Sequence, residues 1–378
     1  MINNYEAKMK VLFLINIPSP YRVEFFNRLS DRIDITVLYQ RRSSSERSKK
    51  WRAPIQDSYT SIFLKGIYTG VDNALSLDVL NYINNSYDLI VICGNSSLTE
   101  ILAMEWCKFK KIPYIVEGDG AFLDTSKTFK AKLKKHILKG ASLYLSTCNE
   151  LDKYYLAYGA KESQIKRYHF SSINKNDVLK EPLSKSEKMK LRKELDIVGD
   201  KIILSTGQFI YRKGFDILLK SMKSFDCGTS LYIIGGEPRK EYMEIIKNNE
   251  LSNVYFKSFM TKEKLKKYYL ASDIFVLPTR EDIWGLVVNE AMAAALPVVT
   301  TERCNAGLEM LSNGKNGVIV PVDDVEALTY GIKTCLSKAS EMSYETLKVI
   351  SKYTLDQMVN DHVLIFNEWR SHNSERLN

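Results

Sequence analysis

The chain has 378 residues, of which 45% are hydrophobic and 26% charged, and its net charge is +9 at pH 7. This length favours two or more domains, and the hydrophobic share excludes general disorder. No run approaches the ~18 apolar residues of a membrane-spanning helix, and residues 1–10 lack the apolar core of a secretion signal. We therefore expect a cytoplasmic protein.

The excess positive charge belongs to the first half of the chain. Residues 1–180 hold 27 lysines and arginines against 18 acids, and the remaining residues hold equal numbers of both. This half is expected to meet an anionic partner. Nucleic acid is not expected, because no zinc finger, aromatic RNA-binding motif or recognition helix is visible. The six cysteines are scattered, without the spacing of a metal site, so we expect reduced, mostly buried thiols and no metal.

Strands and helices alternate from the start of the chain. A buried strand at residues 10–17 is followed by a loop at 18–22 and a helix near 23–29. Further strands are expected at residues 35–39, 89–93, 114–117 and 143–146, with helices at 97–110 and 150–158. This alternation predicts βαβ units and a mostly parallel sheet.

A second series of the same kind begins after a polar, lysine-rich stretch at residues 174–190. Its expected strands are residues 202–206, 231–234, 254–256, 274–278, 297–300 and 317–320, and its helices include 215–223, 262–270 and 286–295. We predict a first domain at 1–173, a linker and helix at 174–198, a second domain at 199–352, and a helix at 353–378 that crosses back to the first domain.

Two segments of the second domain lie where a strand gives way to a helix. The lysine–glycine segment, GQFIYRKG, covers residues 207–214, and the acidic segment, EDIWGLVVNEAM, covers residues 281–292. Ligands of open α/β sheets bind at such places, held by backbone amides and helix N-termini.

The lysine–glycine segment has the composition of a phosphate site. Gly207 allows a tight turn, Lys213 can meet a diphosphate as a point charge, and Gly214 lets the backbone approach. The alternative is an ordinary connection with a solvated pair formed by Arg212 and Lys213.

The acidic segment has donors and acceptors for the rest of a nucleotide. The amides of Gly285, Leu286 and Val287 would be unpaired donors at a helix N-terminus, and Glu290, one turn inside, could accept hydrogen bonds from a ribose diol. Alternatively, Glu281 and Asp282 are simple helix-start charges and Glu290 is solvated. The apolar run AMAAALPVV after Glu290 argues against that alternative.

Together the segments closely resemble the signature of the family-4 retaining glycosyltransferases (glycosyl transferases group 1). The resemblance covers nearly the whole chain, including IPSPYRVEFFNRL near the start and NGKNGVIVPVDD after the acidic segment. It implies the GT-B fold, with two Rossmann-like, doubly wound α/β domains facing each other across a cleft. It also implies sugar transfer from a nucleotide diphosphate donor with retained configuration, without a metal or cofactor.

The resemblance also implies roles for individual residues. Lys213 would hold the diphosphate, Glu290 the ribose, and Asp282 with nearby amides the transferred sugar. Asp119, in a loop of the first domain, is the candidate catalytic residue on the acceptor side; the alternative is a turn aspartate between glycines. The full donor-binding set expected is Gly207, Gln208, Arg212, Lys213, Glu281, Asp282, Trp284, Gly285, Leu286, Val287 and Glu290.

Two positions depart from the family pattern. Asp282 stands where a glutamate is usual, and Gln208 stands where an arginine is common, so Lys213, helped by Arg212, would carry the phosphate charge. Fixed charge and dipoles at the departing diphosphate would supply much of the catalysis. Retention could then proceed by front-face attack, in which the leaving phosphate oxygen takes the acceptor proton.

A basic amphipathic helix is expected at residues 126–140. Phe129, Leu133 and Ile137 recur at spacing four among six lysines. Such a helix can lie on an anionic membrane, or its apolar stripe can face the domain core. The residues expected on the membrane or acceptor side are Arg22, Lys130, Lys134 and Lys135.

The expected function is transfer of a hexose or N-acetylhexosamine, with a UDP-sugar favoured as donor, to a growing, lipid-linked cell-surface glycan. The enzyme would be cytoplasmic or peripheral on the inner face of the membrane. Two alternatives stay open: a catalytically silent relative that binds nucleotide sugar or glycan within an assembly, and an epimerase on the same fold.

Overall fold

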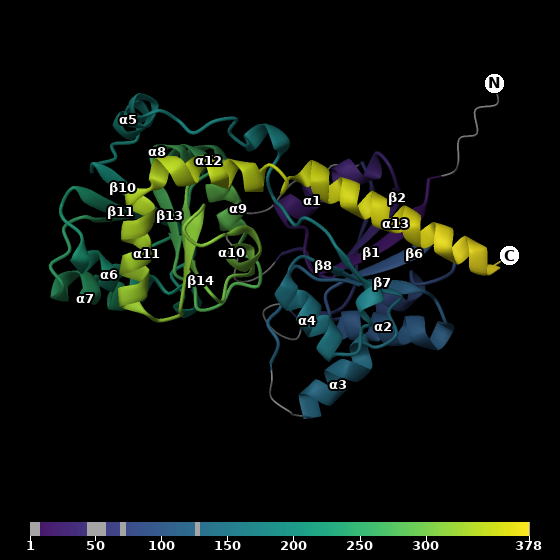
Figure 1. The fold of residues 1–378 in the computed structure, drawn as a ribbon. Helices are drawn as coiled ribbons and strands as arrows, with labels where there is room; N and C mark the ends of the chain where they lie inside the picture. The colour runs from purple at the N-terminus through teal and green to yellow at the C-terminus, as the bar shows by residue number, and fades with distance from the viewer. Residues whose placement is uncertain (1–7, 44–57, 69–72, 125–128, 378) are drawn as a thin grey trace, which may run out of the picture. The chain divides into compact units, whose positions relative to one another are not determined.

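The structure, a computed structural model, describes residues 8–43, 58–68, 73–124 and 129–377. The chain divides into two compact units (Figure 1). Unit 1 combines Met1–Phe170 with Leu355–Asn378, and unit 2 is Ser171–Thr354. Among the described residues, no helix is long and apolar enough to cross a membrane.

Unit 1 is built on a parallel sheet of seven strands in the order β3-β2-β1-β6-β7-β8-β9. The strands are β1 (Lys10–Ile15), β2 (Asp34–Tyr39), β3 (Thr60–Phe63), β6 (Leu89–Cys93), β7 (Tyr114–Glu117), β8 (Leu143–Ser146) and β9 (Ile165–Arg167). Its α-helices are α1 (Pro20–Ser30), α2 (Leu98–Lys110), α3 (Phe129–Leu138), α4 (Asn149–Ala157) and α13 (Leu355–Leu377). Unit 1 also contains a short antiparallel pair of strands, β4 (Ile67–Tyr68) and β5 (Ala74–Leu75).

Helix α1 begins earlier than the sequence pattern predicted. The expected loop at residues 18–22 ends at Ser19, which is extended, and Pro20 opens the helix. A proline fits the first helical position because its fixed φ suits the helix and its missing N–H would be unpaired there anyway. Arg22 is therefore in the first turn of a helix instead of a loop, and it is buried.

Helix α13 contributes to the core of unit 1 although it is the last element of the chain. Its buried Met358, His362 and Phe366 lie on one face. The His362 ring is 4.7 Å from the ring of Phe25 on α1, and Phe366 is 6.1 Å from Phe13 on β1. Figure 1 shows α13 running alongside α1.

Unit 2 is a parallel sheet of six strands in the order β12-β11-β10-β13-β14-β15. The strands are β10 (Lys201–Thr206), β11 (Thr229–Ile234), β12 (Val254–Lys257), β13 (Ile274–Leu277), β14 (Val298–Thr301) and β15 (Gly317–Val320). The α-helices are α5 (Lys185–Glu194), α6 (Phe215–Ser221), α7 (Lys240–Asn248), α8 (Lys262–Ala271), α9 (Leu286–Ala293), α10 (Asn305–Met310), α11 (Val325–Ser337) and α12 (Ala339–Ile350). The expected doubly wound α/β fold is thus confirmed in each unit.

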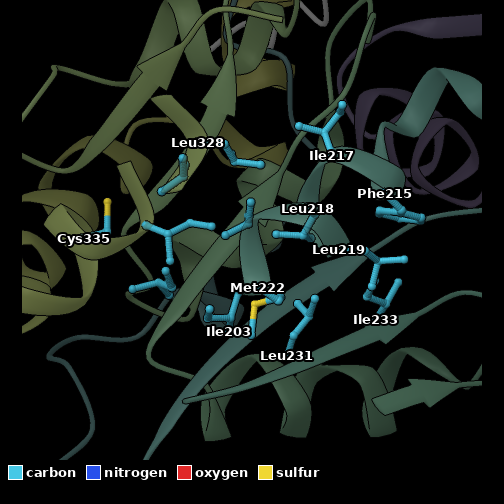
Figure 2. Packing of buried hydrophobic residues seen from close by; sticks show 14 of the residues in the cluster. Ile203, Phe215, Ile217, Leu218, Leu219, Met222, Leu231, Ile233, Leu328 and Cys335 are labelled. Carbon is cyan, nitrogen blue, oxygen red and sulfur yellow. The ribbon is translucent and has the colours of Figure 1, made fainter. Parts of the chain in front are cut away.

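The core of unit 2 fixes the helix that follows the lysine–glycine segment. Figure 2 shows Leu218 and Met222 among Ile203 of β10, Leu231 of β11 and other apolar side chains. These side chains are completely buried, so the strands are covered as expected for a parallel sheet. Because α6 is held along one side of β10 and β11, the turn that leads into it at Gly214 has a fixed position.

Candidate functional site

The two predicted segments meet at the point where the strand order of unit 2 reverses. The lysine–glycine segment follows β10 and the acidic segment follows β13, and these two strands are paired through Ile203 and Ile274. The carboxyl ends of neighbouring parallel strands lie at the same edge of the sheet, and a reversal of order opens a crevice there. The structure therefore brings together the two segments that were identified separately.

Hydrogen bonds join the lysine–glycine segment to Arg280 and to Glu281 at the start of the acidic segment. The Arg280 N–H donates to the Arg212 carbonyl at 2.7 Å, and the Arg212 guanidinium donates to the Glu281 carbonyl at 2.7 Å. Gly214 has a φ of +68°, and a Cβ added there would lie 1.9 Å from the Pro278 carbonyl oxygen. Glycine is thus required by both the conformation and the space. The segments form one continuous two-loop structure.

Lys213 and Asp282 contact each other directly. The Lys213 ammonium lies 2.5 Å from the Asp282 carboxylate, and each side chain is 13% exposed. The Arg212 guanidinium is 3.7 Å from the other carboxylate oxygen. An anionic ligand at this place would meet two cations, and it would compete with the Asp282 carboxylate for the Lys213 ammonium.

Glu281 is turned toward a different partner. Its carboxylate is paired with Arg303, which lies in the loop before α10. The Asp282 N–H also donates to the Arg303 carbonyl, at 2.8 Å. The loop at Arg303 therefore supports the acidic segment, a role that the sequence pattern did not reveal.

The N-terminus of α9 is formed by Gly285. This residue has a φ of +101°, and a Cβ there would lie 2.8 Å from the Cys304 sulfur. The Val288 N–H makes the first helical turn by donating to the Gly285 carbonyl at 2.8 Å. The amides of Leu286 and Val287 precede that bond, so they have the position of helix N-terminal donors suited to an anion.

Trp284 does not have the position expected of a donor-binding side chain. It is 2% exposed, and its indole N–H donates to the Asn289 side chain at 2.9 Å. Its ring also lies 6.4 Å from that of Tyr353. We correct the prediction accordingly: a large apolar ring next to Gly285 is buried in unit 2 and anchors α9 from inside.

Glu290 is linked by hydrogen bonds to the end of β10. Its carboxylate accepts from the Tyr269 hydroxyl at 3.0 Å, and that hydroxyl lies 3.1 Å from the Thr206 hydroxyl. Because Tyr269 donates to the carboxylate, Thr206 donates to Tyr269. Burial raises the pKa of Glu290 above its ordinary value.

A small cavity of about 40 Å³ adjoins Glu290 within unit 2. Tyr269 and the lysines Lys262 and Lys266 of α8 line it, together with Asp177. The Lys266 ammonium is 2.7 Å from the Asp177 carboxylate. Most of the cavity wall is nonetheless apolar. Glu290 therefore lies in a partly enclosed, largely apolar setting, which disfavours the alternative of a freely solvated charge.

Arg280 holds the turn that carries Lys213, and the sequence analysis did not single it out. Its guanidinium lies 3.9 Å from the centre of the Tyr211 ring and donates to both Asp216 carboxylate oxygens at 2.9 and 2.8 Å. A further contact of 2.7 Å joins its Nε to Asp323. Burial alone would raise the pKa of Asp216, but the hydrogen bonds from Arg280 outweigh burial and lower it. The sequence feature that could have indicated this role is that Arg280 directly precedes two acidic residues.

The remaining donor-binding candidates are more exposed. Gln208 is exposed at the start of the lysine–glycine segment, and Gly207 has a φ of +150° after the last strand residue. The exposed Arg212 side chain stands beside the Asp282 carboxylate. The side chains of Gln208 and Arg212 are thus accessible to a ligand.

In unit 1, Asp119 belongs to a cluster of buried charges. Arg22 donates to Asp119 and, at 2.6 Å, to Glu117 at the end of β7. The Asp119 side chain remains 29% exposed and also accepts from the Tyr21 hydroxyl at 3.3 Å. The alternative of a simple solvated turn aspartate is therefore inadequate, because a buried arginine fixes this carboxylate.

Arg22 itself cannot lie on a membrane surface. It is 1% exposed, so its expected place on the membrane or acceptor side is corrected to an internal one. Burial would raise the pKa of Glu117, but the charge of Arg22 and the nearby His362 lower it. The His362 Nε2 is 3.6 Å from the Glu117 carboxylate, so α13 takes part in the cluster.

Helix α3 is present where the basic amphipathic pattern predicted it. Ile137 is 7% exposed and faces the core, whereas Leu133 is 49% exposed. The Lys134 ammonium lies 5.0 Å from the Tyr154 ring, and Lys135 is exposed. The side chain of Lys130 lies outside the described part of the structure. The apolar stripe is thus only partly internal.

Comparison with known proteins agrees with this geometry. Residues 187–355 match the sequence model of the family Glycosyl transferases group 1, which covers a little under half of the chain and nearly all of unit 2. Unit 2 is therefore similar to a glycosyltransferase domain. The two predicted segments both lie within it.

Curated relatives match over parts of their length. The chain is 28% identical over 193 residues to an uncharacterized glycosyltransferase of Methanocaldococcus jannaschii, covering 49% of each chain. It is 27% identical over 165 residues to the lipopolysaccharide core biosynthesis glycosyltransferase LpsE of Rhizobium meliloti, covering 41% of this chain and 47% of that one. It is 28% identical over 153 residues to a GDP-mannose-dependent mannosyltransferase of Mycolicibacterium smegmatis, covering 37% and 40%. The chain spans about half the length of such relatives.

Solved structures match over nearly the whole chain. HepE of Anabaena in complex with UDP has a TM-score of 0.77 at 16% identity, covering 95% of this chain and all of that one. Sucrose-phosphate synthase of Thermosynechococcus elongatus has a TM-score of 0.73 at 16% identity, covering 97% and 100%. The lipopolysaccharide glycosyltransferase WaaG has a TM-score of 0.68 at 15% identity, covering 94% and 99%. The expected GT-B fold is thereby confirmed.

Proposed function

We propose that the protein is a retaining glycosyltransferase that moves a hexose or N-acetylhexosamine from a nucleotide diphosphate sugar to a growing glycan. The observation that carries the proposal is the meeting of Lys213, the α9 N-terminus and Glu290 at the strand reversal of a glycosyltransferase domain. These groups supply a cation, anion-binding amides and a carboxylate, which are the three partners that a nucleoside diphosphate needs.

In the proposed donor complex, the diphosphate takes the ammonium of Lys213 and the amides of Leu286 and Val287. Asp282, released from its contact with Lys213, turns its carboxylate to hydroxyls of the transferred sugar. Glu290 accepts from the ribose diol, and Tyr269 keeps its carboxylate in place. Each of these partners forms a charge-assisted hydrogen bond with the donor, and such bonds are stronger than those between neutral groups.

Bond cleavage is proposed to depend on charge stabilisation at the diphosphate. As the sugar–oxygen bond lengthens, negative charge grows on the leaving phosphate, where Lys213 and the α9 amides are already fixed. The acceptor hydroxyl attacks from the same face and passes its proton to the leaving phosphate oxygen, so configuration is retained. We assign no metal to this step, because residues of the chain supply the positive charge. Asp119, fixed by Arg22, is proposed to bind the acceptor hydroxyl as it attacks.

We propose UDP as the nucleotide and a lipid-linked, cell-surface glycan as the acceptor. HepE was solved with UDP and with UDP-glucose, and LpsE is named for lipopolysaccharide core biosynthesis, which supports this choice. The mycobacterial relative is named as GDP-mannose-dependent, so GDP is the competing nucleotide. The positive charge of residues 1–180 supports a location on the inner face of the membrane.

A thermal-shift screen against UDP, GDP and their sugars tests the donor. We expect UDP to raise the melting temperature and GDP to have little effect; a clear preference for GDP would overturn the choice of UDP. Transfer assays on Lys213→Ala and Glu290→Ala then test the site. Lys213→Ala removes a fixed donor of charge stabilisation and is expected to lower turnover about 10²–10³-fold. Glu290→Ala removes a ribose contact and is expected mainly to raise the donor KM. Lys223→Ala, an exposed lysine after α6, is the matched control.

The same experiment separates the alternative functions. Binding of nucleotide sugars without any turnover would support the silent relative, which Gln208 and the shorter acid Asp282 motivate. Release of an epimerised free sugar without an acceptor would support an epimerase. Turnover that depends on EDTA-removable metal would contradict the charge assignment made here.

A further inference from the structure

An exposed aromatic pair stands at the C-terminal end of α2. Phe109 is 73% exposed, and its ring centre lies 5.7 Å from that of Trp106. The Lys110 ammonium is 4.9 Å from the Trp106 ring and 5.5 Å from the Phe109 ring. A large apolar side chain exposed to this degree, beside a second aromatic ring and a cation, is typical of an interaction surface.

Helix α3 continues this surface. The Lys108 ammonium of α2 binds the carbonyls of His136 and Ile137, each at 2.8 Å, and the His136 ring contacts Glu105 at 3.7 Å. Phe109 is four residues from Glu105 on α2, and Leu133 is three residues from His136 on α3. Residues at these spacings share a helix face, so both exposed apolar side chains flank the contact between the helices.

The charge around these apolar side chains is strongly positive. Five exposed lysines lie at the C-terminal end of α2, on α3 or directly after these helices: Lys110, Lys111, Lys132, Lys135 and Lys139. The sequence of α3 contains no acid, and the partly exposed acid of α2, Glu105, is already paired with Lys108 and His136. We name these five lysines, with Trp106, Phe109 and Leu133, the α2–α3 platform.

We propose that the α2–α3 platform binds the surface of an anionic lipid bilayer, with Phe109 and Leu133 entering the headgroup region and the lysines contacting lipid phosphates. Aromatic rings favour the membrane interface, and long lysine side chains reach anionic headgroups while their stems stay on apolar surface. Protein interfaces, in contrast, are depleted of lysine. The combination of exposed rings and five lysines therefore favours a lipid surface over a protein partner.

The platform is separate from the residues proposed for catalysis. It lies where α2 leads into β7 and α3 leads toward β8, at the edge where these strands begin, whereas Asp119 follows the end of β7. The chain could thus be held on a membrane without covering Asp119. This inference deepens the membrane location in the proposed function, but lipid binding needs neither donor nor acceptor.

Vesicle co-sedimentation of the full chain tests the inference. The probes are vesicles of pure phosphatidylcholine and vesicles with about 30% phosphatidylglycerol, each at low and high salt. We expect binding to the anionic vesicles only, weakened by salt because the lysine contribution is screened. Lys110→Gln combined with Lys135→Gln should weaken low-salt binding by about 25-fold, at roughly fivefold per lysine.

The aromatic contribution is tested by Phe109→Ala. It should weaken binding about tenfold at both salt concentrations, because loss of apolar burial is not screened. Tyr330→Ala, which removes an aromatic ring of 70% exposure on α11, and the pair Lys223→Gln with Lys247→Gln are the matched controls. Melting temperature and UDP binding should be unchanged in all variants.

Several results would overturn the proposal. Absence of binding to anionic vesicles at low salt would do so, as would binding by the platform variants equal to that of the wild type. Self-association that depends on Phe109 and occurs without lipid would identify a protein interface instead. Failure of transfer with intact vesicle binding would count against the proposed function and leave this inference standing.

Discussion

Gly214→Ala tests whether the approach of the two loops is needed for both stability and donor binding. The new Cβ would lie 1.9 Å from the Pro278 carbonyl oxygen, whereas real Cβ contacts are essentially never under 3.0 Å. Both groups are fixed to backbone, so the loops must separate. Gly314→Ala is the matched control, because Gly314 also has a positive φ, +78°, but no atom within 4 Å of an added Cβ.

The magnitude follows from these contacts. Each alanine is expected to cost about 1–2 kcal/mol of unfolding free energy for its left-handed conformation. Gly214→Ala should cost a further ~2 kcal/mol, because separation strains the turn and breaks the 2.7 Å hydrogen bond from Arg280 to Arg212. For a unit of this size the added loss corresponds to a melting temperature roughly 4–8 °C below that of the control.

Thermal unfolding and calorimetric titration with UDP measure the two effects. Gly214→Ala should bind UDP at least about tenfold more weakly, because Lys213 moves with the turn. Gly314→Ala should bind UDP like the wild type. Equal melting temperatures and equal UDP affinities in the two variants would refute the reasoning.

Three further variants probe other contacts. Arg280→Lys loses the two-pronged contact with Asp216, so the donor KM should rise about tenfold while kcat changes less; an unchanged KM in steady-state kinetics would contradict its positioning role. Because burial raises the pKa of Glu290, its carboxylate is protonated at a higher pH than an ordinary glutamate and then accepts hydrogen bonds from the ribose less well. UDP affinity should therefore fall as the pH drops through the pKa of Glu290, and Glu290→Gln should flatten the calorimetric pH profile. The free energy of unfolding has the opposite pH dependence, since a buried carboxyl with a raised pKa makes unfolding easier as the pH rises from about 4.5. This decrease should be absent in Glu290→Gln. Arg22→Gln leaves Glu117 buried without its cation and should cost about 3–5 kcal/mol in denaturant unfolding; a loss under 1 kcal/mol would argue against the buried pair.

The sequence pattern was sufficient for the architecture because parallel strands buried on both faces leave long apolar runs. Strands such as β10 and β13 stand out in this way. In contrast, β9 (Ile165–Arg167) is short and polar, and β3 is only partly buried, so neither has a strong pattern. The start of α1 was missed because Pro20 was interpreted as a loop residue, although a proline is also well suited to a first helical turn.

Spacing along the chain also located the two loops of the candidate site, but it could not reveal which side chains pair within them. The contact between Lys213 and Asp282 depends on how two strand ends meet, and that is set by strand order. Trp284 was misassigned because a motif shows residue types and not the direction in which a ring points. Arg280 was missed because its partners Asp216 and Asp323 are distant in sequence.

The discontinuity of unit 1 has a consequence for biosynthesis. On the ribosome its seven strands are made first, yet His362 and Phe366, which pack against α1 and β1, emerge only after the whole of unit 2. Unit 2 is continuous in sequence and can complete its core while unit 1 still lacks α13. Until α13 has been made, the apolar face formed by Phe13 and Phe25 lacks its cover, so chains truncated before Leu355 should be prone to aggregation and to chaperone binding.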